Sequence, residues 1–185
     1  MNKSFPILSI LAAIVLFATA FGALVVQAQP DERAVAKPAA YDAVLGKSLN
    51  DKEVADFITS NNCSSAGAFQ LCQQIGMALW LDVDQKVKSV YLYPARTNGF
   101  SAYKGALPLG LAANDTMATI EQKFGQPKVE HAPQAGWEPG LPDESRSPDY
   151  IHYWAIYKRF GVTVIYNSPS PADKNATIYT ILVNK

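Results

Sequence analysis

The sequence predicts an α+β protein in which two helix-plus-antiparallel-hairpin repeats form a shared antiparallel sheet, with the helices on one face. Two observations support this prediction. Segments with the helical spacing of apolar residues precede segments with strand-like alternation, and this order occurs twice. Sliding the sequence by 64 residues also places Leu-Gly at 45–46 on Leu-Gly at 109–110, and Asn-Asp at 50–51 on Asn-Asp at 114–115.

The repeats are expected at 41–102 and 103–185. A unit of about 65 residues leaves much of its apolar surface exposed, so we expect the two units to pack over one core.

The first predicted helix begins after Asn50. This residue fits the N-cap position, because it places Glu53 at the third helical position and completes a capping box. The expected buried stripe consists of Val54, Phe57 and Ile58.

Two strands are expected next, at 76–83 and 87–93, with a polar turn at 84–86 between them. Alternation along the first strand places one set of side chains on one face and Trp80 and Asp82 on the other. The first set consists of Met77, Leu79 and Leu81.

The second predicted helix is capped by Asn114 or Asp115, and Gly125 and Pro127 end it. Its apolar stripe consists of Met117, Ile120 and Phe124. Strands are expected at 150–157, 162–167 and 177–183, with a turn at 158–161. The long loop 127–149 separates this helix from its strands, and a loop of that length in a compact domain is often functional.

Charge and the amino terminus limit the possible partners. The 16 basic residues balance 16 acidic ones, so the chain lacks the basic surface that nucleic-acid binding requires. Residues 1–28 have the features of a signal peptide, with Lys3 at the start, an apolar run and a small residue, Ala28, at the expected cleavage site. We therefore expect an extracytoplasmic protein, secreted or periplasmic, after cleavage near Ala28.

A flexible tether is expected at 29–40, which is rich in Pro, Ala and charge. The alternative is an uncleaved leader, since about twenty apolar residues can span a bilayer. In that case the protein is a structural envelope component, and the leader is its contact with the membrane.

Two cysteines, Cys63 and Cys72, stand nine positions apart. An oxidising compartment favours a disulfide between them. A free nucleophilic cysteine would need a histidine partner, and no supporting motif is present.

Catalytic and cofactor motifs are absent from the sequence. It contains no serine-hydrolase elbow, zinc-protease motif or phosphate-binding loop. The alternative to a non-catalytic protein is a small hydrolase or metal-assisted enzyme that uses His131 or His152, with Glu130 or Asp149 nearby. We expect no cofactor, no metal site and no catalytic activity.

Aromatic residues are the main candidates for binding. Large, stiff side chains on an open sheet face suit contact with another protein. The candidate residues are Trp137, Tyr91, Tyr93, Tyr153 and Tyr157. Trp137 lies in the long loop, whereas the four tyrosines lie on predicted strands.

The second helix carries a recognisable pattern, Gly110-Leu-x-x-x-Asp115-Thr followed by an apolar stripe and Phe-Gly-Gln-Pro at 124–127. It resembles the repeat of the SmpA/OmlA envelope lipoprotein family, and in tandem it is similar to the beta-lactamase inhibitory proteins. That resemblance implies a duplicated helix-and-sheet unit that binds a partner protein with a concave aromatic face. The lipid-attachment cysteine of the lipoproteins is missing here. The inhibitors usually have a disulfide in each half, whereas only the first half of this chain has cysteines.

Together these features predict an exported, non-catalytic module that docks on another protein through an aromatic sheet face and loop. An inhibitor, an immunity protein and an envelope accessory protein all fit this prediction.

Overall fold

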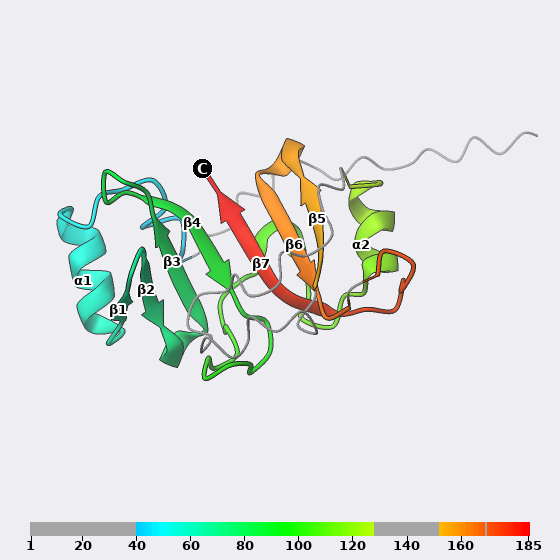
Figure 1. The fold of residues 1–185 in the computed structure, drawn as a ribbon, viewed down its shortest axis with the longest axis horizontal. Helices are drawn as coiled ribbons and strands as arrows, with labels where there is room; N and C mark the ends of the chain where they lie inside the picture. Colours follow the sequence, from blue (N-terminus) through cyan, green and yellow to red (C-terminus); the bar gives the residue numbers. More distant parts are fainter. Residues whose placement is uncertain (1–39, 128–151, 169) are drawn as a thin grey trace, which may run out of the picture. The chain divides into compact units, whose positions relative to one another are not determined.

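The computed structural model describes residues 40–127, 152–168 and 170–185 (Figure 1). In these residues the α+β class is confirmed, because two α-helices accompany one seven-stranded antiparallel sheet. The strand order is β1-β2-β3-β4-β7-β6-β5, so β4 and β7 lie side by side in the middle (Figure 1). The predicted leader, most of the tether and loop, Trp137 and His131 lie outside the described residues.

The elements have the following bounds. The helices are α1 (Lys52–Ser60) and α2 (Met117–Phe124). One half of the sheet contains β1 (Ser64–Ala66), β2 (Phe69–Cys72), β3 (Met77–Leu81) and β4 (Val87–Leu92). The other half contains β5 (Tyr153–Tyr157), β6 (Val162–Tyr166) and β7 (Ile178–Asn184). Short 3-10 turns occur at η1 (Gln73–Ile75), η2 (Pro108–Gly110) and η4 (Lys158–Phe160).

The start of α1 differs from the prediction. The N-cap residue is Asp51 rather than Asn50, and no side chain caps the helix. The Asp51 carboxylate instead accepts a hydrogen bond from the Ser48 backbone N–H at 2.9 Å. Glu53 forms an ion pair with Lys47, so it does not complete a capping box.

The start of α2 also differs by one or two residues. Its N-cap is Thr116, not Asn114 or Asp115, and Thr116 forms a capping box with Thr119. The Asp115 carboxylate points back along the chain and accepts from the Ala112 backbone N–H at 2.8 Å. Gly125 ends the helix as predicted.

One face of the sheet carries the main core, and both helices pack on it. Alternate residues of β3 contribute Met77, Leu79 and Leu81, as predicted. The helices contribute Val54, Met117 and Ile120, whose side chains are fully buried. The partly buried helical residues of the same cluster are Phe57, Ile58 and Phe124. At roughly 25 cal/mol per Å² of apolar surface, burial on this face is the main stabilising contribution.

Irregularities recur at corresponding places in the two halves. Each half contains a 3-10 turn that ends in a glycine with positive φ, 69° at Gly76 and 64° at Gly161, followed directly by a strand. Each following hairpin has a register shift, between Trp80 and Leu81 and between Ile165 and Tyr166. A side chain at Gly76 is excluded, since an added Cβ would lie 2.3 Å from the Ser101 carbonyl oxygen.

The two halves join where β4 pairs with β7. Tyr91 lies opposite Leu182, with Val90 opposite Val183 and Leu92 opposite Ile181. The hydrogen bonds between β4 and β7 make the sheet continuous.

The predicted disulfide is confirmed between Cys63 and Cys72. It connects Cys63, three positions after the end of α1, to the last residue of β2. The sequence analysis predicts no strand between the two cysteines. It therefore missed β1 and β2, which pair within the disulfide loop.

Candidate functional site: the aromatic face of the sheet

The face of the sheet opposite the helices carries a second apolar cluster, here called the aromatic face. It draws residues from β2 to β7 and from the loop after β4. The buried members are Leu71, Ala78, Tyr91, Tyr93, Phe100, Ile165, Tyr179 and Leu182, and the partly buried ones are Phe69, Trp80 and Trp154. Among the described residues, neither α1 nor α2 contributes to it.

Aromatic rings contact one another across this face. Tyr93 stacks on Phe100 with ring centroids 4.2 Å apart and meets Tyr179 edge-on at 6.4 Å. His152 in turn stacks on Tyr179 at 4.1 Å. The Asn98 side chain also donates a hydrogen bond to the Tyr179 hydroxyl. These contacts attach the loop that follows β4 to β7 and make the surface stiff.

The aromatic face has a buried floor and a partly exposed rim. Tyr91 and Tyr93 are each 1% exposed, so they support the surface from below. Phe69, Trp80 and Trp154 are half-buried and form the rim. The rim is not purely apolar, because the Lys88 ammonium lies 5.0 Å from the Trp80 ring centroid.

The structure divides the predicted binding residues into two groups. Tyr91 and Tyr93 lie on the aromatic face, whereas Tyr153 and Tyr157 lie in the main core on the helix side. Tyr157 packs edge-on against Phe124 of α2, with ring centroids 5.8 Å apart. Only the first pair therefore lies on the side of the sheet away from α1 and α2.

The core tyrosines form a cluster of their own. Tyr153 stacks on Tyr166 at 6.0 Å. Burial raises the pKa of Tyr166, and the neighbouring Tyr157 and the Glu121 carboxylate raise this pKa further. The Glu121 carboxylate is itself paired with the Lys174 ammonium at 2.6 Å. These phenols therefore stay protonated at neutral pH and provide packing rather than a base.

The contacts of His152 indicate a structural role rather than a catalytic one. Its Nδ1 lies 2.9 Å from the Tyr166 carbonyl oxygen, which can only accept, so Nδ1 carries the proton. Burial lowers the pKa of His152, and the bond to the carbonyl opposes this only in part. The ring is therefore neutral at pH 7. Within 40–127, 152–168 and 170–185 no three His, Cys, Asp or Glu side chains are grouped as metal ligands.

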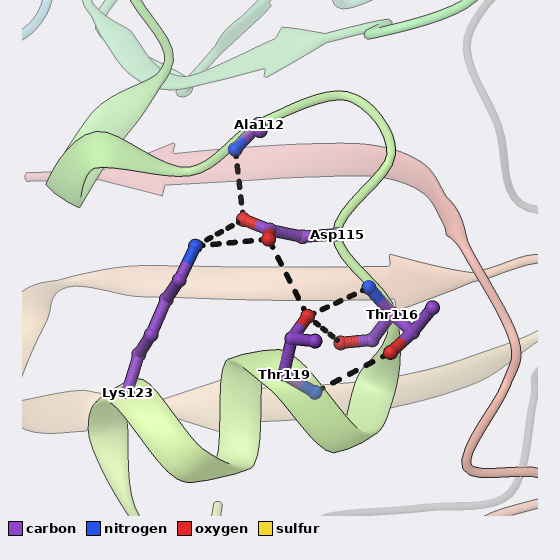
Figure 2. A network of polar contacts seen from close by, with 5 residues as sticks. All are labelled: Ala112, Asp115, Thr116, Thr119 and Lys123. Atoms are coloured by element: carbon purple, nitrogen blue, oxygen red, sulfur yellow. Dashed lines mark hydrogen bonds and ion pairs between the residues drawn. The ribbon is translucent and has the colours of Figure 1, made fainter.

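A network of charged and polar side chains lies at the start of α2 (Figure 2). The Lys123 ammonium lies 2.9 and 2.7 Å from the two carboxylate oxygens of Asp115. Thr119 donates to Asp115 at 3.4 Å and accepts from the Thr116 backbone N–H at 2.8 Å. In Figure 2 one bond, from Ala112 to Asp115, lies within the turn before the helix, and the other contacts connect this turn or the N-cap to Thr119 and Lys123 of the helix, so we interpret the network as a helix cap.

The candidate binding residues chosen from the sequence leave out five aromatic members of this face: Phe69, Trp80, Phe100, Trp154 and Tyr179. Phe69 and Leu71 alternate with the more polar Gln70, a weak strand signal that the nearby cysteines obscured. Phe100 lies on a loop, where periodicity carries no information.

Comparison with protein families, curated proteins and solved structures finds no match to this chain. In the described part of the chain, neither α-helix has the length and apolar content needed to span a bilayer.

Proposed function

We propose that this protein is an exported, non-catalytic binding module that docks on another protein through the aromatic face. One observation carries the proposal: on the side of the sheet away from both helices, half-buried aromatic residues on β2, β3 and β5 belong to the same cluster as the buried Tyr91 and Tyr93. Tyr and Trp are enriched at interfaces, because they offer large contact areas with few rotatable bonds. Trp80 and Trp154 are the expected anchors, and Tyr91 and Tyr93 hold them in place.

We further propose that the chain is a tandem duplication of the SmpA/OmlA-like type. Support begins at the two helix starts. Ser48 donates to Asp51 at 2.9 Å and Ala112 donates to Asp115 at 2.8 Å, the same turn at positions 64 apart. A shared hydrogen bond at the offset found by sequence is stronger support than residue identity alone.

The strands support the duplication at a second offset. The glycines 76 and 161 and the register shifts after 80 and 165 are each 85 residues apart. The last strand of each half corresponds at a third offset, 91 residues, since Leu79 faces Val90 and Val164 faces Ile181. On this interpretation, the aromatic face extends over both copies and the partner contacts both.

Export is the remaining part of the proposal. It rests on the leader at 1–28 and on the disulfide, which is compatible with an oxidising compartment outside the cytoplasm.

A binding experiment with matched variants tests the docking face. Mature protein is used to capture partners from envelope and medium fractions, alongside Trp80→Ala, Trp154→Ala and the control Val83→Ala. Val83 is 96% exposed at a hairpin tip and belongs to neither apolar cluster. We expect a stoichiometric protein to be recovered with wild type and the control but to be at least tenfold depleted with either Trp variant. Equal recovery from all four proteins would contradict the proposal, provided that near-ultraviolet circular dichroism shows them folded.

A further inference from the structure

The register shift between β3 and β4 inserts one extra residue into β4. Trp80 of β3 lies opposite Ser89. The next residue of β3, Leu81, lies opposite Val87. Lys88 is therefore the extra residue of a β-bulge, in which two successive residues of one strand lie opposite a single residue of the other. A bulge interrupts the alternation of side chains along the strand and redirects the extra one.

The bulge turns Lys88 toward the aromatic face. Val87 and Val90 both belong to the main core although they are three positions apart, which strict alternation does not allow. Between them Lys88 reaches the other side of the sheet, where its ammonium lies 5.0 Å from the Trp80 ring centroid. Trp80 is a half-buried member of the aromatic face, so the bulge places a positive charge at the rim of an apolar surface.

The second half has a bulge of the same kind. There Tyr179 of β7 is the extra residue, and it too belongs to the aromatic face. Tyr179 follows Lys88 by 91 positions, the offset that relates the last strands of the two halves. Its contacts are internal, because His152 stacks on its ring and Asn98 donates to its hydroxyl. Tyr179 thus attaches a loop to the sheet, whereas Lys88 is exposed to solvent.

Lys88 is the one charged residue in the seven strands of the described sheet. A partner that covers Trp80 also removes water from the neighbouring ammonium, which is unfavourable unless another polar group replaces that water. The Trp80 ring holds the ammonium in place through a cation–π contact. A carboxylate on the partner would complete the interactions of the ammonium, since no strand of the described sheet supplies one.

We propose that Lys88 selects the partner of the aromatic face: the partner segment that contacts Trp80 presents an Asp or Glu side chain beside an apolar one. The assignment rests on the docking function proposed above and names the chemistry of the partner. A segment with Lys or Arg at this place would bring two cations together in a contact that excludes water, so it is rejected. The aromatic residues provide contact area, and the bulge provides specificity.

Selection from a phage-displayed library of random dodecapeptides tests the assignment. The baits are the mature protein, Lys88→Glu, Trp80→Ala and the control Lys52→Glu, each shown to be folded by near-ultraviolet circular dichroism. Lys52 is exposed on α1, on the opposite side of the sheet. Among peptides that require Trp80, we expect Asp and Glu to be enriched about threefold with wild type and with the control. With Lys88→Glu we expect Lys and Arg to be enriched instead.

Individual peptides provide a second measurement. Replacing the acidic residue of a selected peptide by its amide is expected to weaken binding to wild type by about fivefold and to leave binding to Lys88→Met unchanged, because methionine keeps the length of the side chain and removes its charge. Equal losses with both proteins would overturn the assignment.

The selection separates failure of this assignment from failure of the docking function. If peptides that require Trp80 are equally acidic with wild type and with Lys88→Glu, the aromatic face docks but Lys88 does not select its partner. If no selected peptide requires Trp80, the docking face itself is contradicted, and the role of Lys88 with it.

Discussion

Asp115 is a carboxylate with three kinds of partner and only 9% of its surface exposed. Burial alone would raise the pKa of Asp115. The hydrogen bond and charge of Lys123, with bonds from the Ala112 N–H and the Thr119 hydroxyl, more than offset burial and lower this pKa. Because Lys123 is 41% exposed, solvent screens much of the ion pair, and the bonds to Ala112 and Thr119 carry a substantial part of the effect.

The first prediction concerns the pH dependence of stability. The folded-state pKa of Asp115 lies below the unfolded value of about 3.9, so its stabilisation is present above that pH and is lost as the pH falls through the folded value. Asp115→Asn is expected to lower the free energy of unfolding by about 1 to 2 kcal/mol at pH 7, and by progressively less below about pH 4. Urea titrations at pH 7, 5 and 3 measure this, with exposed Asp84→Asn as control. If the difference in free energy of unfolding between wild type and Asp115→Asn were the same at all three pH values, the prediction would be wrong and the effect would come from packing alone.

The helix caps illustrate what residue-level sequence reasoning can achieve. It located both helix starts to within two residues, because Asn, Asp and Thr cluster there. It chose the wrong cap each time, since Asp51 and Asp115 both direct their carboxylates backward, to Ser48 and Ala112. Several residues in each cluster were able to cap a helix, and backbone geometry decided among them.

At the scale of elements, the end of each helix is attached to the sheet in a different way. The Cys63–Cys72 disulfide follows α1, whereas α2 ends in Phe124, which packs on Tyr157 and Phe160. A covalent link constrains the unfolded chain, while an aromatic contact stabilises the folded state directly. The two helices should therefore respond differently to a reducing agent.

The second prediction concerns removal of the disulfide, which acts at the scale of elements. Replacing Cys63 and Cys72 by serine is expected to lower the free energy of unfolding by about 2 to 3 kcal/mol. Amide hydrogen exchange should accelerate in α1, β1 and β2 and stay unchanged in α2. Wild type with reduced cysteines is the matched control and should behave like the double variant. Equal acceleration in both helices would show that the bond acts on the whole fold.

Elements with a strong period were predictable and short ones were not. Both helices, β3, β4, β5, β6 and β7 were located because their apolar residues recur every two or every three to four positions. β1 and β2 contain three and four residues, which is too few for a period to stand out. They exist because β3 offers an edge that pairs with β2 and because the disulfide closes the loop.

In the whole molecule, one continuous sheet connects the two halves through β4 and β7. Val90, Leu92 and Ile181 are each 0% exposed, and Val183 lies opposite Val90. A seam this well buried couples the halves, so neither is expected to unfold while the other remains intact.

A core truncation at the seam tests this coupling. Ile181→Ala is expected to lower the free energy of unfolding by about 2 to 5 kcal/mol and to retain a single transition. Amide signals from β3 and from β6 should be lost at the same urea concentration. Val83→Ala, at an exposed hairpin tip, should change stability by less than about 0.5 kcal/mol. Separate midpoints for the two strands would indicate independent domains.

Sequence reasoning predicted a shared antiparallel sheet, and the structure contains one. It did not predict which strands would meet in the middle, because pairing between distant strands leaves no local pattern. The same limit applies to the aromatic face. Tyr91 and Tyr93 lie on the aromatic face, but Tyr153 and Tyr157 have the same alternation and lie on the other face.

The seam has a consequence for how the protein assembles. Under the proposed duplication Tyr91 and Leu182 correspond, because their partners Ala78 and Thr163 are 85 residues apart. They also lie opposite each other, so the β4 edge is complementary to itself. A free unit of this kind would need a second molecule to complete its sheet, and its assembly would weaken on dilution. Joining two units in one polypeptide keeps the edges together at an effective concentration in the millimolar range. A single chain that holds both units therefore keeps its sheet intact at any dilution.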